Sequence, residues 1–180
     1  WIYAPDNHTD QIEYVLFYPT TRLKNALPEL SMGIPIYYDY LAGEFHGNTS
    51  QTLAMYYAPP GCLRILDSDI ERLNRLIPEQ SLMRFSANIS DPNLIVNEPR
   101  AQMPVVYGPE PEHDFCFYFQ KAEHARQFKD WDSVVKYSES ALSLNDHPYE
   151  PAEQFVFIEG YAHVGEWERA VDLSVSTYEV

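Results

Sequence analysis

The sequence predicts an α+β fold, in which a small antiparallel sheet with short helices is followed by helical hairpins. Residues 34–66 contain three apolar or aromatic stretches separated by turn-forming residues, a pattern typical of strands. Helical spacing begins at Asp67 and dominates from Asp114 onward, where prolines almost vanish. We therefore divide the chain into a mixed α+β part, residues 1–111, and a helical part, residues 112–180.

The predicted strands lie in the first 66 residues. Residues 11–18 (QIEYVLFY) are rich in β-branched and aromatic side chains and predict a strand. Residues 38–46 and 51–57 are expected to pair as a hairpin, because Gly47-Asn48 between them can adopt positive φ at little cost. Residues 62–66 (CLRIL) add one more apolar stretch.

Short helices and a connecting segment follow the strands. Asp67 or Ser68 caps a predicted helix that extends to residue 77, where Pro78 ends it. Residues 78–89 predict a second short helix. The next segment, up to residue 111, contains five prolines that exclude a long regular element, so we interpret it as a connection that covers the sheet.

The helical part divides into two similar halves. Residues 115–128 and 131–144 predict one pair of amphipathic helices, and residues 155–164 and 167–178 predict a second pair after the break HPYEP. The halves align on their turns, with these matches: Lys129 with Gly165, Asp130 with Glu166, Trp131 with Trp167, Val134 with Ala170, Ser138 with Ser174, and Ala141 with Thr177.

These two halves resemble tetratricopeptide repeats, which have a small residue in the first helix, a Gly-acid-aromatic turn and an alanine three residues after the aromatic residue. Ala122 takes the small position in the first half, whereas Ile158 departs from the pattern in the second. An ordinary helical bundle has the same apolar spacing and remains the alternative. Because stacked repeats need about three units for stability, we expect these two to rest on the N-terminal part or to continue beyond Val180.

A wider resemblance covers most of the chain and is carried by residues 45–66, 107–135 and 154–165. They resemble the soluble C-terminal region of bacterial multi-pass membrane proteins of the glycosyltransferase-like type. The resemblance implies a domain on the extracytoplasmic face of the membrane, with the catalytic carboxylate in a membrane portion outside this sequence. The chain lacks an initial Met and stops within a helical pattern, so we also expect it to be a piece of a longer protein.

Charge and composition restrict the partners. A net charge of −15 disfavours nucleic acid and anionic membrane surfaces, which attract Lys and Arg. No apolar run approaches the roughly 20 residues that cross a bilayer, so membrane contact is expected only through segments outside this sequence. Cys62 and Cys116 permit one internal disulfide, and two buried free thiols are equally compatible with the sequence.

Motifs for catalysis are missing from the sequence. It contains no phosphate-binding glycine loop, no G-x-S-x-G and no H-E-x-x-H, so we expect no catalytic residue, metal or cofactor and no enzymatic activity in this fragment. Glu44 and His46 have the spacing of a metal or acid–base pair on a strand, but a polar hairpin tip has it too. Residues 110–114 (EPEHD) suit either a cation or the N-terminus of a helix.

The candidate binding residues come from the alignment with the repeats, in which the first helix of each pair faces the partner. They are Phe119, Glu123, Arg126, Gln127, Phe155, Glu159 and His163. The Arg126 guanidinium could bind a partner carboxylate at two points, or it could form an ion pair with Glu123.

We therefore expect a non-catalytic extracytoplasmic interaction or scaffold domain of a larger membrane protein, which binds a protein or peptide through its helices. The alternative is an accessory domain of a membrane glycosyltransferase that binds the acceptor or a glycan. In that case the rings of Tyr38 and Tyr57 would stack on sugar.

Overall fold

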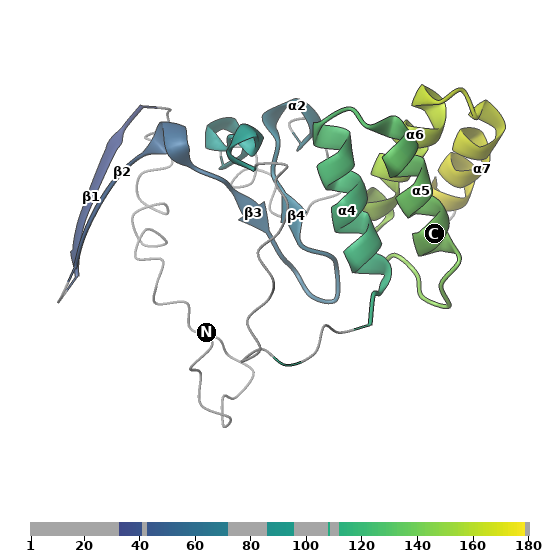
Figure 1. Ribbon diagram of the computed structural model, residues 1–180, viewed down its shortest axis with the longest axis horizontal. Helices are drawn as coiled ribbons and strands as arrows, with labels where there is room; N and C mark the ends of the chain where they lie inside the picture. The colour runs from purple at the N-terminus through teal and green to yellow at the C-terminus, as the bar shows by residue number, and fades with distance from the viewer. Residues whose placement is uncertain (1–32, 41–42, 72–85, 96–107, 109–111, 179–180) are drawn as a thin grey trace.

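The computed structural model describes residues 33–40, 43–71, 86–95, 108 and 112–178. Within these residues the fold is α+β: the sheet of β1 and β2 lies at one end of the molecule, four longer helices lie at the other, and β3 and β4 lie between them (Figure 1). No helix in this described part has the length and apolar character needed to cross a membrane.

The first sheet pairs β1 (Pro35–Tyr40) with β2 (Gly43–Asn48), so the predicted hairpin between residues 38–46 and 51–57 is wrong. Pro35 pairs with Asn48, which places Gly47-Asn48 at the end of a strand rather than in the turn of a hairpin. The Asn48 side chain accepts a hydrogen bond from Ser50 N at 2.9 Å and caps a 3₁₀ turn, η2 (Thr49–Gln51). The same residue types suit both roles, because Asn favours turns and helix caps alike.

The second sheet pairs β3 (Met55–Tyr56) with β4 (Arg64–Ile65), which lies within the predicted stretch 62–66. It is followed by α2 (Ser68–Glu71) and, further along the chain, by η3 (Pro92–Leu94) in the proline-rich connection. The predicted strand 11–18 lies outside the described residues. So do most residues of the two predicted short helices.

The four longer helices are α4 (Phe115–Gln127), α5 (Trp131–Leu142), α6 (Phe155–His163) and α7 (Trp167–Tyr178), and a 3₁₀ turn, η5 (Pro151–Gln154), precedes α6. Local capping explains where the first two begin. The Asp114 carboxylate accepts from Phe117 N at 2.8 Å, and the Asp130 carboxylate accepts from Ser133 N at 3.2 Å. The predicted positions of all four helices are confirmed.

The helices pack as two consecutive pairs that share one core. Buried side chains from α4, α5 and α6 meet there: Phe115, Phe119, Ala122, Val134, Val156 and Phe157. At Gly160 of α6, a Cβ atom would lie only 2.5 Å from Cγ1 of Val134, so glycine permits the close approach of α5 and α6. Both pairs turn through a residue with positive φ, 57° at Lys129 and 86° at Gly165.

Three contacts tie the sheet region to the helices. A disulfide joins Cys62, just before β4, to Cys116 in α4. The buried Glu153 carboxylate accepts from Cys62 N at 2.6 Å, and the Gln127 side chain donates to Pro92 O. These contacts hold the helical pairs against the described residues of the sheet region.

Candidate functional site

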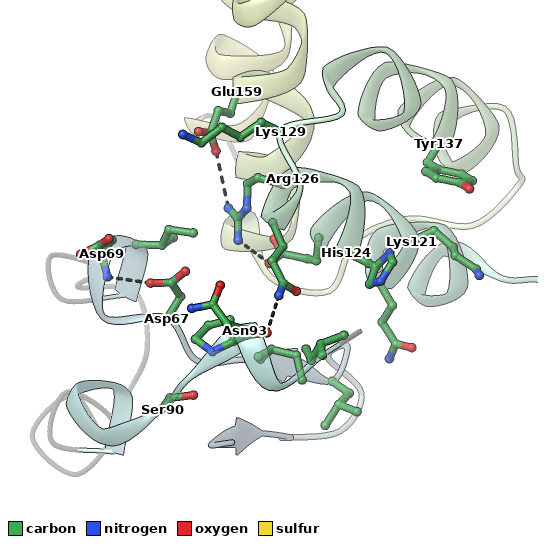
Figure 2. A pocket seen from close by; sticks show the side chains of 18 of the residues that line it. Asp67, Asp69, Ser90, Asn93, Lys121, His124, Arg126, Lys129, Tyr137 and Glu159 are labelled. Carbon is green, nitrogen blue, oxygen red and sulfur yellow. Dashed lines mark hydrogen bonds and ion pairs between the residues drawn. The ribbon is translucent and has the colours of Figure 1, made fainter. Parts of the chain in front are cut away.

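A cleft of about 1190 Å³ lies between α4 and the segments that contain α2 and η3 (Figure 2). We call its two sides the helical wall and the loop wall. The helical wall consists mainly of α4 side chains together with Trp131, Tyr137, Glu159 and His163. The loop wall consists of residues from 63–70 and 90–95, and its polar members are Asp67, Ser68, Asp69, Ser90, Asp91 and Asn93.

A chain of charged groups runs along the helical wall. Arg126, whose side chain is 9% exposed, forms an ion pair with Glu123 one turn earlier on α4. Its other terminal nitrogen lies 3.6 Å from Oε2 of Glu159 on α6, and Oε1 of Glu159 lies 3.8 Å from Nε2 of His163. The His163 ring stacks on Trp131, with ring centroids 3.9 Å apart and planes 6° apart. Polar contacts thus extend from the buried base of the wall to its exposed rim.

The loop wall presents mainly hydrogen-bond acceptors. The Asp67 carboxylate accepts from Asp69 N at 2.8 Å, and the Asp91 carboxylate accepts from Asn93 N at 3.0 Å. These bonds shape two tight turns and leave each carboxylate with further acceptor capacity. Gln127 bridges the walls at the base of the cleft through its bond to Pro92 O. The cleft therefore has acidic acceptors on one side and charges of both signs on the other.

A second ion pair, between Arg64 and Glu71, is buried close to Glu123. Nη2 of Arg64 lies 2.7 Å from Oε1 of Glu71, and both side chains are almost completely buried. Burial raises the pKa of Glu123, and the nearby carboxylates of Glu71 and Glu159 raise it further, whereas the positive charges of Arg126 and Arg64 lower it by less. The base of the helical wall thus favours the protonated form of Glu123 more than water does.

We expect the raised pKa of Glu123 to make the protein less stable as the pH increases above the ordinary glutamate pKa of 4.5. Between the unfolded and folded pKa values the folded state binds more protons, so the free energy of unfolding falls with increasing pH. Glu123→Gln, which resembles the protonated side chain, removes this contribution. Urea denaturation from pH 4 to 7 should show the wild type losing stability relative to the variant; a relative gain would mean that the ion pair with Arg126 dominates.

Five of the seven predicted partner-binding residues line the cleft: Glu123, Arg126, Gln127, Glu159 and His163. Phe119 does not, because it is fully buried among the core side chains and cannot contact a partner in this structure. Phe155 is exposed at the start of α6 but lies outside the cleft. The ion pair that we considered as the alternative role of Arg126 is present, and it holds the guanidinium in place.

The predicted glycan-binding tyrosines have separate positions. Tyr57 is 60% exposed and lines a second hollow of about 480 Å³, together with Tyr149 from the segment between α5 and η5. Tyr38 belongs to β1, but its side chain lies outside the described residues.

The two weaker candidate clusters have local contacts. Oε2 of Glu44 lies 3.3 Å from Nε2 of His46 on the exposed strand β2. His113 stacks on Phe117 with centroids 3.6 Å apart, while Asp114 caps α4. Residues 110 and 111 lie outside the described part. Within that part, no group of three or more His, Cys, Asp or Glu side chains is arranged to hold a metal ion.

Sequence reasoning missed the loop wall and Trp131 as parts of the site. The Asp-x-Asp and Asp-Pro-Asn stretches at residues 67–69 and 91–93 indicate turns, but nothing in their spacing indicates that they face α4. The repeat pattern indicates only packing at the turn for Trp131, and the structure adds that its ring faces His163 at the edge of the cleft.

Comparisons with protein-family models, with curated proteins and with solved structures found no match to this chain. The geometry of the cleft is therefore the main support for a function.

Proposed function

We propose that the chain is a non-catalytic interaction domain that binds an extended segment of a partner protein or a peptide in the cleft. The observation that carries the proposal is that five residues, chosen from the helical repeat alone, line one cleft. A peptide backbone offers N–H donors and C=O acceptors in alternation. The loop wall supplies acceptors for the former, and Lys129, Gln127 and His163 supply donors for the latter.

We further propose that the helical part is tetratricopeptide-like. In support, both helical pairs turn through a residue of positive φ followed by an acid and a tryptophan, at Lys129 and at Gly165. The small residue Ala122 is fully buried at the position where the repeat places a small side chain. A cleft on the first helices of the two pairs, α4 and α6, is where such repeats would receive a peptide.

The proposed setting is the extracytoplasmic face of a bacterial membrane, as part of a larger glycosyltransferase-like membrane protein. The disulfide between Cys62 and Cys116 supports an oxidising compartment, because disulfides persist outside the cytosol and are rare inside it. The strongly acidic charge agrees with a partner that is neither nucleic acid nor an anionic lipid surface.

Selection from a random-peptide display library tests the proposed cleft. We expect enriched peptides whose Kd increases about tenfold when three exposed cleft residues are changed together. The triple variant is Asp69→Ala, Asn93→Ala and His163→Ala. A matched control exchanges the same residue types outside the cleft: Asp132→Ala, Asn145→Ala and His147→Ala, all exposed. Peptides that bind both triple variants equally, or a selection without enrichment, would contradict the proposal.

The second candidate function is glycan binding, and the exposed position of Tyr57 favours it. The hollow beside it contains a second exposed ring, Tyr149, and the polar side chains of Asp114, Gln120 and Asp146. An aromatic face suits a sugar ring, and these side chains can accept hydrogen bonds from its hydroxyl groups. Glycan-array binding that is lost in Tyr57→Ala and kept in the cleft triple variant would favour this function over peptide binding, whereas no binding at millimolar sugar would exclude it.

A further inference from the structure

Helix α7 carries an exposed apolar stripe. Trp167, Val171, Val175 and Tyr178 are 64, 58, 52 and 92% exposed. At about 100° per residue these four side chains project within roughly 80° of one another around the helix. Ala170 and Thr177, on another side of α7, are buried. A continuous stripe of this kind, which includes a tryptophan, is typical of a surface that binds another protein.

The first half of the helical part shows what covers two of the four equivalent positions; the other two, Glu139 and Leu142, are exposed. In the alignment of the two halves, Trp131 and Val135 of α5 correspond to Trp167 and Val171 of α7. Helix α6 covers them in two ways. Its His163 stacks on Trp131, and a Cβ atom at Gly160 would lie 3.7 Å from Cγ2 of Val135. Helix α6 thus presents to α5 a glycine, which lies closest to the buried Val134, and a flat ring three residues later.

Charges at the edge of the stripe indicate the polar character of the partner. Glu168 and Asp172 are exposed and lie beside the stripe, at about 100° and 140° from Trp167 around the helix. Arg169 lies on the far side, where its guanidinium binds Glu166 at 2.7 Å and Glu139 at 3.0 Å. The stripe thus has an acidic edge on a chain with a net charge of −15, so a second copy of the chain would be repelled.

We infer that the stripe on α7 binds an amphipathic helix of a different polypeptide. The bound helix places a glycine or alanine against Val171 and a flat ring on Trp167, as α6 does on α5, and it carries Lys or Arg opposite Glu168 and Asp172. This surface is separate from the cleft, because no α7 residue lines the cleft. The inference therefore goes beyond the proposed peptide binding and does not depend on it.

A helical peptide with the sequence around α6 provides the probe. It consists of residues 151–165 with added lysines at both ends and a fluorescent label, and its binding to the whole 180-residue chain is followed by anisotropy. We expect saturable binding that Trp167→Ser weakens about tenfold or more. The matched control Tyr37→Ser changes an aromatic residue of β1 that is 65% exposed and lies outside α7, and it should leave the Kd unchanged.

Two comparisons make the result specific. The same peptide with glutamates at its ends should bind more weakly than the lysine form, and the difference should shrink at high salt. The cleft variant Asn93→Ala should leave binding of the lysine peptide unchanged, which separates this surface from the proposed cleft function. Equal binding by wild type and Trp167→Ser would overturn the inference. So would a dimer in sedimentation equilibrium that Trp167→Ser abolishes, since the occupant would then be a second copy.

Discussion

Replacing Cys62 and Cys116 together by alanine is expected to lower the free energy of unfolding by about 4 kcal/mol. The disulfide links two residues 54 positions apart. Without it the unfolded chain gains the conformational entropy of a loop of that length, and the folded state has no corresponding gain. Urea denaturation of the oxidised wild type and of the double variant measures the difference. Alanine is a suitable replacement, because Cys62 is buried in the core and a polar substitute would add its own cost.

Reduction of the wild type supplies the control for this experiment. Wild type with a reducing agent and the double variant should unfold at similar urea concentrations, since both lack the cross-link. The disulfide also fixes Cys62, which directly precedes the loop wall, to α4. Peptide binding in the cleft should therefore weaken along with stability. A loss below about 1 kcal/mol would mean that the unfolded chain retains structure that already holds the two cysteines close together.

The four longer helices could be predicted from the sequence because their signals are local. Apolar residues at helical spacing mark the buried side, and Asp114 and Asp130 cap the first two helices from adjacent positions. The sequence places the starts of α4, α5, α6 and α7 at the residues where the structure begins them. The candidate residues on the cleft side of α4 and α6 follow from the same period, which is why most of them meet in space. Phe119 is instead buried in the core, because helical period alone does not separate a core position from a neighbouring position at the edge of the cleft.

Features that depend on distant contacts could not be predicted in the same way. The turn residues Gly47-Asn48 are compatible with a hairpin and with a cap, and only the pairing of Pro35 with Asn48 decides between them. The loop wall faces α4 because a disulfide and the bond from Gln127 to Pro92 bring together segments that are far apart in the chain. No local pattern indicates such a contact. The exposed stripe on α7 is a similar case, because its apolar spacing would equally suit a core.

Glu153 is the residue whose importance is least visible in the sequence, and we expect Glu153→Ala to lower the free energy of unfolding by about 4 kcal/mol. Its carboxylate is fully buried and accepts from three backbone N–H groups, at 2.6 Å from Cys62, 2.9 Å from Tyr149 and 3.3 Å from Glu150. Alanine removes the acceptor and leaves these donors without a partner. The buried Cys62 donor then costs about 1 to 3 kcal/mol, and the part-buried donors of Tyr149 and Glu150 add smaller costs. Urea denaturation again measures the loss.

Two further variants separate this role from a general effect of removing an acid. Glu153→Gln keeps one acceptor oxygen in a side chain of the same size but turns an amide donor toward backbone donors, so its loss should lie between those of wild type and alanine. Glu168→Ala removes an exposed acid from α7 and should change stability by less than about 0.5 kcal/mol. If Glu153→Ala were as mild as Glu168→Ala, water would have to reach the three donors. The bond from Cys62 to Glu153 would then not be what holds β4 against the start of α6.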